Sequence, residues 1–266
     1  MTTARREPAF VIAATGLLAE AQIAARSANV NTVVSGGNAT HLARLIEVAI
    51  AEGGRAILSF GIAGGLSEDL QPGSCLVGSE VVHAGKLYRA DPAWTGRLAR
   101  RLTISTVERF QLRSRFQACD AEMQRGGYQE HGEGPAECGR ALHRIAGVDR
   151  ALSIPCDKRA LNAATGATAV DMESHVVADL AARHGLPFAA VRAIADPVGR
   201  AIPRAALVGM RSDGTMNAVA CLRVLMRDPG QVPALVRLGV DTSRAMLQLL
   251  RCVKLLGPGL GFFERG

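Results

Sequence analysis

Short, continuous apolar runs alternate with amphipathic stretches along the first part of the chain. The runs at 10–15, 31–35 and 55–61 predict buried strands, and the stretches at 16–28 and 38–54 between them predict helices. Strands that are apolar on both faces need helices on both sides of the sheet. We therefore predict an α/β fold with a mostly parallel or mixed central sheet flanked by helices.

The alternation continues after the third run, with one long interruption. The run at 74–82 predicts a fourth strand, and a helix at 173–184 is followed by a strand at 187–195. A tight glycine turn is expected at 62–65, directly after the third strand. Residues 104–140 are polar and weakly periodic, so we interpret them as an irregular excursion from the domain.

The C-terminal part has a mostly helical pattern. Helices are expected over 204–228 and 232–256, separated by proline and glycine. We place the α/β domain at 1–203 and interpret 204–266 as a helical extension of the same domain.

Composition limits the classes of function. The 266 residues are 48% hydrophobic and 21% charged, which indicates a large globular domain with a full core. Aromatic residues make up only 4%, too few for a surface that stacks single-stranded nucleic acid. The net charge of +7 suits a phosphate substrate or a membrane surface. Because arginine is dispersed along the chain, we predict no nucleic-acid partner.

Cysteine and histidine spacing gives no sign of a metal site. The six cysteines lie far apart without a CxxC pair, and the histidines lack ligand spacing. We predict no metal, no organic cofactor, and reduced thiols in a cytoplasm.

The N-terminus resembles a secretory signal peptide, because two arginines precede an apolar run. Glu7 precedes that run and Gly16 interrupts it, so a strand that turns into a helix is the preferred interpretation. No apolar run reaches the roughly 18–20 residues that a membrane span needs.

Several polar and glycine residues follow the predicted strands. In open α/β sheets, ligands bind beyond the carboxyl ends of the strands. The residues expected at that edge are Glu20, the segment Ser35, Gly36 and Gly37, the segment 61–65, and Asp196. The glycines allow a close approach of backbone to ligand, although a tight turn alone explains them equally well.

Two acids stand out within the sequence "AVDMESHVVADLAARHGLPFAAVRAIAD". Glu173 begins a helix, where an acid often serves only the helix dipole. Asp196 ends a buried strand, where desolvation raises a carboxyl pKa and suits the group to donate a proton. The structural alternative for Asp196 is a cap or a loop salt bridge.

The segments "GIAGGL…LQPGSCLVGSEVV" and "AVDMESHVVADLAARHGLPFAAVRAIAD" resemble the nucleoside phosphorylase superfamily, in particular methylthioadenosine/S-adenosylhomocysteine nucleosidase. The DMESH form and the C-terminal extension most closely resemble the hopanoid-associated phosphorylases, which are thought to remove adenine from adenosylhopane. The core resemblance covers about residues 9–90 and 150–200.

The resemblance implies a role for each acid. Glu173 would bind the ribose 2′- and 3′-hydroxyls, with Met172 packed against the sugar. Asp196 would protonate purine N7 as the glycosidic bond breaks, and Glu20 would activate water. Arg192 matches an arginine near the nucleophile.

The resemblance also implies which residues line the substrate site and which hold the nucleophile. Gly61, Ala63 and Gly64 would line the substrate site, and the segment 35–37 would hold phosphate or water. Ile62 and Ala195 replace serines of the family, so the nucleophile stays open between water and phosphate as a co-substrate. No aromatic purine contact is identified near 153–161.

We predict an enzyme that releases adenine from a 5′-substituted adenosine, with adenosylhopane as the substrate that the resemblance favours. The alternatives are a phosphate-independent methylthioadenosine/S-adenosylhomocysteine nucleosidase, a non-catalytic nucleoside-binding protein, and an interaction protein of a lipid-synthesis complex.

We expect a cytoplasmic homo-oligomer that acts on a small-molecule or lipid-linked nucleoside. Residues 231–266 carry apolar and cationic side chains at helical spacing, which fits either packing on the core or contact with the inner membrane face.

Overall fold

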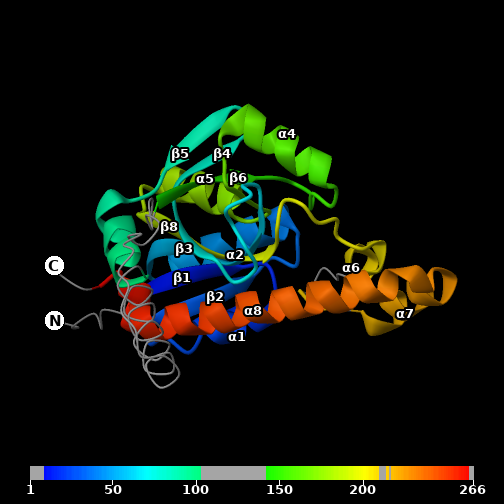
Figure 1. The fold of residues 1–266 in the computed structure, drawn as a ribbon. Helices are drawn as coiled ribbons and strands as arrows, with labels where there is room; N and C mark the ends of the chain where they lie inside the picture. The colour runs from blue at the N-terminus through cyan, green and yellow to red at the C-terminus, as the bar shows by residue number, and fades with distance from the viewer. Residues whose placement is uncertain (1–8, 103–141, 210–213, 216, 264–266) are drawn as a thin grey trace, which may run out of the picture.

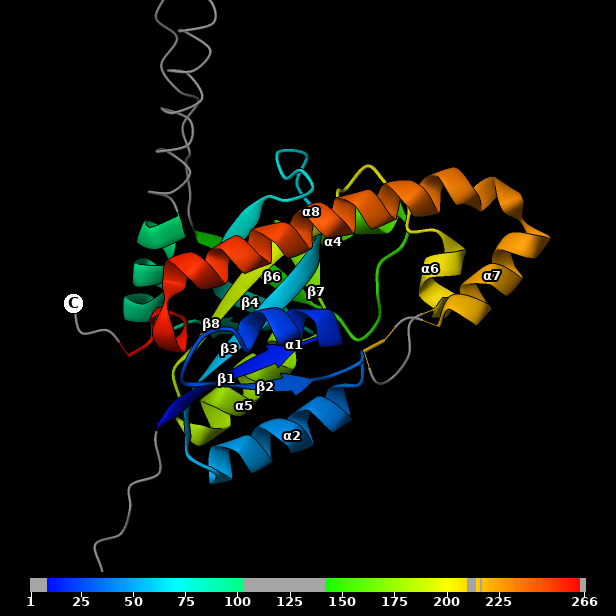
Figure 2. The ribbon, with the colours of Figure 1, turned by 90° about the horizontal axis from the view of Figure 1, so that it is seen from below.

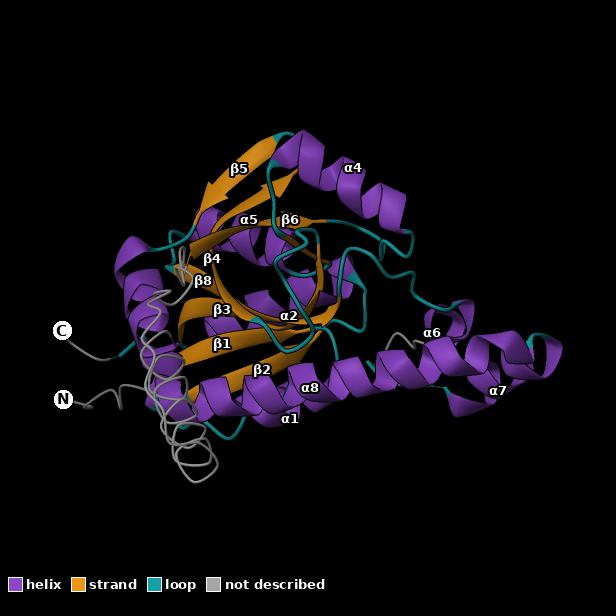
Figure 3. Ribbon diagram, in the orientation of Figure 1, coloured by secondary structure: helices purple, strands orange, loops and turns teal. Residues whose placement is uncertain are grey.

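The computed structural model describes residues 9–102, 142–209, 214–215 and 217–263. A curved sheet runs through these residues with helices on both sides (Figure 1, Figure 3). The strands are β1 (Phe10–Thr15), β2 (Val30–Val34), β3 (Gly54–Gly65), β4 (Cys75–His83), β5 (Lys86–Arg89), β6 (Leu142–Gly147), β7 (Ala169–Asp171) and β8 (Phe188–Asp196). The predicted excursion at 104–140 and the first eight residues lie outside the described part.

The helices predicted over 16–28, 38–54, 173–184 and 232–256 are present, but the one predicted over 204–228 is divided, since residues 214, 215 and 217 are not helical. The helices are α1 (Leu18–Ala24), α2 (Ala39–Ala51), α4 (Pro155–Thr165), α5 (Ser174–His184), α6 (Arg204–Gly209), α7 (Ala218–Arg227) and α8 (Val232–Leu256). Residues 92–102 are also helical, and two short 3₁₀ helices, η1 (Pro229–Gln231) and η2 (Pro258–Gly261), flank α8.

Five strands of the sheet close on themselves. β3 pairs with β8 in parallel, β8 with β4 antiparallel, and β4 with β6 in parallel. β6 then pairs with β7 in parallel, and β7 returns to β3 antiparallel. β1 and β2 extend the sheet beyond β3 in parallel, and β5 forms a hairpin with β4. The predicted α/β class is confirmed, with a mixed sheet.

The predicted turn at 62–65 is wrong, because β3 continues through Gly65. The backbone there has partners on both sides: Gly61 pairs with Arg192 of β8, and Gly65 pairs with Ala169 of β7. Glycines in the last part of this strand instead leave room for neighbouring side chains, as the site below shows.

Two apolar layers hold the helices on the sheet. Alternate residues of β1 face opposite sides: Val11 packs in the layer under α1 and α8, and Ile12 in the layer under α2 and α5. This alternation follows from the period of two along a strand. β1 ends beside the middle of β3, because Ala14 pairs with Ser59 and β3 continues to Gly65.

The predicted helix at 232–256 is α8, and its two halves have different surroundings. Leu249, Val253 and Leu256 are buried in the core layer that α8 shares with β8. The first half of α8 continues past the sheet and, with α6 and α7, forms an arm that projects from the body (Figure 2). The apolar tail after α8 also turns inward, since Leu260 is buried against Trp94.

Candidate active site

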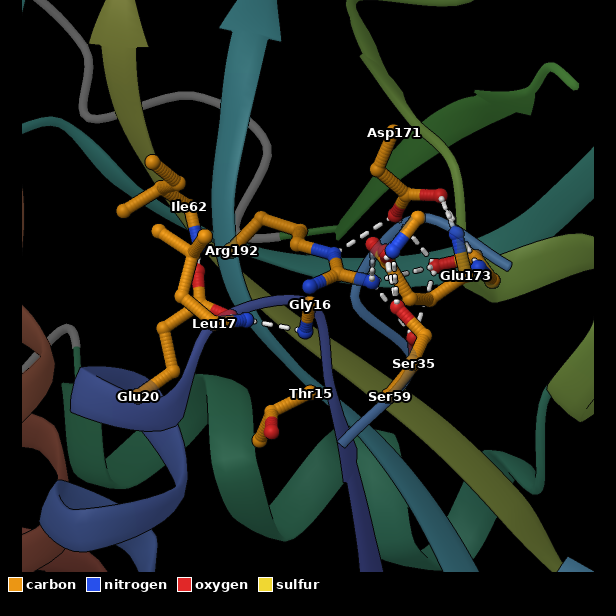
Figure 4. A network of polar contacts seen from close by, with 12 residues as sticks. Thr15, Gly16, Leu17, Glu20, Ser35, Ser59, Ile62, Asp171, Glu173 and Arg192 are labelled. Carbon is orange, nitrogen blue, oxygen red and sulfur yellow. Dashed lines mark hydrogen bonds and ion pairs between the residues drawn. The ribbon is translucent and has the colours of Figure 1, made fainter. Parts of the chain in front are cut away.

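Glu20 lies at the start of α1, directly after β1, and its carboxylate is held by three backbone N–H groups. Gly16 and Leu17 each donate to Oε2 at 2.8 Å, and Ile62 of β3 donates to Oε1 at 2.7 Å. The first two bonds are those of a helix-capping glutamate that reaches back to the residues before the helix. The third joins the carboxylate to the central strand, as Figure 4 shows.

Arg192 of β8 lies beside Glu20, and Gly61 makes room for both. A Cβ atom on Gly61 would lie 2.7 Å from Nη1 of Arg192 and 2.7 Å from Oε1 of Glu20. A side chain at position 61 would therefore displace the carboxylate of Glu20, the guanidinium of Arg192 or both. This contact explains the glycine better than a turn does.

A buried polar network fixes the guanidinium of Arg192. Its Nε donates to Oδ2 of Asp171 at 2.5 Å, and Nη2 donates to the hydroxyl of Ser59 at 2.5 Å. Ser174 completes the network by donating to Oδ2 of Asp171 at 2.5 Å. Within the described residues, Nη1 of Arg192 is buried without a hydrogen-bond partner, so one donor remains for a ligand.

Glu173 lies on the other side of this network, at the N-cap position of α5. Its Oε1 accepts a hydrogen bond of 2.9 Å from Ser35, and its Oε2 lies 3.8 Å from Nη2 of Arg192. Gly16 is needed here as well, since a Cβ on it would lie 2.9 Å from Oε1 of Glu173. Met172 reaches the same region, with its Cε 3.4 Å from the position of a Cβ on Gly37.

The electrostatics follow from three carboxylates around one guanidinium. Burial, and then the charge of Glu173, raise the pKa of Glu20 from 4.5 to about 7. Burial also raises the pKa of Glu173, against the attraction of Arg192. Burial alone would lower the pKa of Arg192, but Asp171, Glu173 and Glu20 together raise it. The guanidinium therefore stays charged, and Glu20 titrates in the neutral range.

Asp196 ends β8 and forms a second, separate pair with Lys158 of α4. Lys158 donates from Nζ to Oδ2 of Asp196 at 2.5 Å, and to the backbone carbonyls of Pro197 and Arg200 at 3.2 Å each. Burial raises the pKa of Asp196, and the ammonium of Lys158 opposes that rise. The loop salt bridge considered for Asp196 thus exists, on a carboxyl that is also largely desolvated.

A β-bulge aims Asp196 toward the end of β3. Ala63 pairs with Ile194, but the next residue, Gly64, pairs with Asp196, so Ala195 is the extra residue. A Cβ on Gly64 would lie 3.2 Å from Oδ2 of Asp196. Gly61 and Gly64 are three residues apart, so the Glu20 and Asp196 clusters are separated by about 10 Å along one strand.

Four residues of this arrangement, Ser174 among them, had no role in the sequence interpretation. Asp171 lies in the motif that drew attention to Glu173, but nothing in the spacing showed that it binds Arg192. Ser59 is inside an apolar run. Lys158 lies 38 positions before Asp196, and only the packing of α4 brings the two together.

The region that contains both clusters matches the family model described as the phosphorylase superfamily, over residues 15–227. The chain belongs to the phosphorylase superfamily. This membership agrees with the predicted enzyme class.

One curated relative within the superfamily is 5′-methylthioadenosine/S-adenosylhomocysteine nucleosidase of Treponema pallidum (strain Nichols). It is 29% identical over 177 residues, which are 63% of this chain and 66% of the relative. The alignment thus spans just under two thirds of the relative's length.

Two solved structures show the same fold at low identity. Futalosine hydrolase of Helicobacter pylori strain 26695 has a TM-score of 0.52 and 15% identity, over 93% of this chain and 99% of that chain. The 5′-methylthioadenosine/S-adenosylhomocysteine nucleosidase of Helicobacter pylori, with butyl-thio-DADMe-Immucillin-A, has a TM-score of 0.52 and 14% identity, over 92% and 97%.

In this member of the superfamily, the segment 35–37 is a poor phosphate site. The N–H groups of Ser35 and Gly36 donate to the carbonyls of Thr15 and Gly16, at 2.8 and 3.1 Å. The N–H of Gly37 donates to the hydroxyl of Ser35 at 3.0 Å. Because all three donors are used within the protein, the segment positions Glu173 through Ser35 and leaves no free amide for an anion.

Proposed function

We propose that the protein is a nucleosidase that cleaves the N-glycosidic bond of a 5′-substituted adenosine and releases adenine. The observation that carries this proposal is the buried Glu20, which three backbone donors hold beside Arg192 and Gly61. Asp196 lies beside Gly64, three residues further along β3. This arrangement supplies a base and an acid on one strand end, at a separation that one nucleoside can span.

Asp196 would act as the general acid. The transition state of glycosidic cleavage resembles an oxocarbenium ion, and unprotonated adenine is a poor leaving group. Protonation of N7 by the carboxyl of Asp196 would turn the base into a neutral leaving group. The raised pKa of this carboxyl favours the protonated form that the step requires.

Glu173 would hold the ribose. A carboxylate accepts hydrogen bonds from two neighbouring hydroxyls, and such charge-assisted bonds are stronger than neutral ones. Ser35 and Arg192 fix the carboxylate of Glu173 from two directions, and Met172 lies close enough to pack against the sugar.

Water is the nucleophile that the charges favour. A phosphate ion would enter a site where Glu20, Asp171 and Glu173 already surround the single guanidinium of Arg192. A dianion there would be repelled and desolvated together. Glu20, with a pKa of about 7, is well matched to remove a proton from water at neutral pH.

The 5′ substituent is the finer part of the proposal. We propose a bulky polycyclic lipid, as in adenosylhopane, on the strength of the resemblance of the DMESH motif and the C-terminal extension to the hopanoid-associated phosphorylases. The projecting arm supports this choice, because it exposes apolar side chains on α7 and α8: Val219, Leu222, Met226, Val232, Val236 and Val240. The rival substrates are methylthioadenosine and S-adenosylhomocysteine.

Adenine release tests the function directly. Purified protein is incubated with adenosylhopane, methylthioadenosine or S-adenosylhomocysteine, each with and without phosphate, and adenine is quantified by chromatography. We expect release without phosphate, fastest for adenosylhopane, with the 5′-substituted ribose rather than its 1-phosphate as the second product.

The matched variants are Asp196→Asn and Asp69→Asn, the latter in an exposed loop. Asp196→Asn removes the transferable proton and should lower the rate by about 10²–10⁴-fold, while Asp69→Asn should not. Absence of adenine release by a folded wild type on all three substrates would favour the non-catalytic alternative.

A further inference from the structure

Apart from the Glu20 and Asp196 clusters, three side chains of types that bind metal ions lie close together. They come from the ends of two strands and the start of a helix. His83 ends β4, Asp149 follows β6, and His175 lies in the first turn of α5. Each offers one ligand atom, and the three atoms lie within 4.8 Å of one another.

One distance within this cluster equals the separation of two ligand atoms that bind the same metal ion. Nε2 of His175 lies 3.4 Å from Oδ1 of Asp149, and the rings of His83 and His175 stack with centroids 4.1 Å apart. Two ligands that each lie about 2.1 Å from a tetrahedral zinc ion are about 3.4 Å apart. The pair of His175 and Asp149 already has that separation.

His83 is oriented as metal-binding histidines are. Its Nδ1 lies 3.0 Å from the backbone carbonyl of Gly147, to which it can donate. A backbone acceptor on one ring nitrogen fixes the tautomer and leaves the lone pair on the other, here Nε2.

His175 supplies the buried half of the cluster. Its side chain is only 9% exposed, and within the described residues its Nδ1 has no hydrogen-bond partner. A buried, unpaired imidazole nitrogen requires an explanation. Nε2 of His175 faces Oδ1 of Asp149, and an ion between these two atoms would replace the proton that Nε2 otherwise shares with the carboxylate, with the ring proton then on Nδ1.

An ion can reach the cluster from outside. The side chain of Asp149 is 78% exposed. His83 and Asp149 line a cavity of ≈ 610 Å³ together with Val148 and Leu152, and no residue of the Glu20 or Asp196 cluster lines it.

We propose that His83, Asp149 and His175 form a binding site for a divalent transition-metal ion of the zinc type. Two imidazoles and one carboxylate match the donors of three-ligand zinc sites, with the fourth position open to water from the cavity. The ion would join the end of β4 to the first turn of α5. The sequence pattern predicted no metal because the histidines have no ligand spacing along the chain, and this proposal departs from that prediction because the fold brings positions 83, 149 and 175 together.

Metal retention tests the site. Full-length protein is stripped with chelator, incubated with Zn²⁺, passed through a desalting column and analysed for zinc per chain. The wild type should retain one equivalent. Asp149→Asn and His83→Gln should bind at least about 100-fold more weakly, since loss of an outer-shell partner alone costs about 10–100-fold. His184→Gln, an exposed histidine of α5, is the control and should retain zinc.

Thiols require a separate readout, because Sγ of Cys75 lies 3.1 Å from Sγ of Cys252. With Co²⁺ as the probe, the proposed site should give tetrahedral d–d bands without a thiolate charge-transfer band. The proposal is wrong if the wild type retains no zinc, if thiolate bands dominate, or if Asp149→Asn retains as much as His184→Gln. Asp149 is exposed, so its variant should fold and decides the question even if His83→Gln does not.

Discussion

The ammonium nitrogen of Lys158 lies 2.5 Å from Oδ2 of Asp196, and the lysine side chain is completely buried. The same ammonium donates to the carbonyls of Pro197 and Arg200, so it fixes the loop that follows β8 as well as the carboxyl. With Oδ2 held in this way, Oδ1 of Asp196 is the oxygen available to a purine. We therefore assign Lys158 the role of positioning the proposed acid.

Replacement of Lys158 by Met should separate orientation from charge. The variant loses the bond that fixes Asp196, and misplacement of a catalytic group costs about 10²-fold in rate. It also loses the cation that holds the pKa of Asp196 down, so this pKa should rise. The limb of the kcat/KM profile at which Asp196 loses its proton should move to higher pH.

Lys158→Arg serves as the control for charge and should keep the Asp196 limb near its original position. If Lys158→Met lowers the rate without moving the Asp196 limb, the lysine has only a structural role. Circular dichroism and the Tm of each variant show whether the fold is kept.

Glu20 should produce a second limb of the same profile, at its own pKa. Its raised pKa of about 7 means that the carboxylate, which is the form able to accept a proton, becomes the major species only above neutral pH. Activity should therefore rise with pH through about 7. In Glu20→Gln the base is absent, so hydrolysis should fall by about 10²–10⁴-fold and the limb should disappear.

Glu47→Gln, an exposed position on α2, should behave like the wild type. Release of adenine by Glu20→Gln at the wild-type rate in phosphate-free buffer would place the base elsewhere. A wild type that works only with phosphate would contradict the preference for water.

Glu173 should determine the preference for ribose. A hydrogen bond to a charged group contributes about 1.5–3 kcal/mol, so the wild type should prefer the ribose substrate over its 2′-deoxy analogue by about 10–100-fold. Glu173→Gln should lose most of this preference. Ser35→Ala, which removes one bond to Glu173, should lose part of it. The ratio of kcat/KM values for the two substrates measures the effect, and an unchanged ratio in Glu173→Gln would rule out the role.

The sequence patterns predicted the elements that carry a clear periodicity of their own. β1 is apolar on both faces because helices cover both, and α8 kept its period over all 25 residues. β6 and β7 were not predicted, because β6 carries His143 and Arg144 at its exposed end and β7 has only three residues. Such short or partly polar strands have no periodicity of their own and depend on their neighbours for hydrogen bonds.

The candidate site was predictable to the extent that it follows strand ends. Glu20 and Asp196 come directly after or at the end of apolar runs, so their place at the sheet edge follows from the pattern. The pairs of Arg192 with Asp171 and of Lys158 with Asp196 depend on how distant elements pack, for which one sequence holds no signal. The same is true of the glycines of β3, whose small size serves side chains on other strands.

The last prediction concerns the arm. The second half of α8 is packed in the core, so within the described C-terminal helices a contact with a membrane would come from α7 and the first half of α8. There Leu222 and Met226 are exposed, Met226 at 77%, next to Arg223 and Arg227. None of the described helices is long and apolar enough to cross a membrane. An apolar stripe flanked by arginines suits the surface of an anionic bilayer, where a lipid-linked nucleoside would be dissolved.

We expect the full-length protein to co-sediment with anionic liposomes at low salt, and less so at high salt because the charges are screened. Truncation before α8 would remove Leu249 and Val253 from the core and unfold the protein, so point substitutions are the sharper test. Leu222→Asp with Met226→Asp should abolish sedimentation and leave hydrolysis of a soluble nucleoside unchanged. Val48→Asp, on the exposed face of α2, should change neither. If the wild type stays in the supernatant, or if the double variant loses self-association instead, the arm contacts another protein surface and the membrane role is wrong.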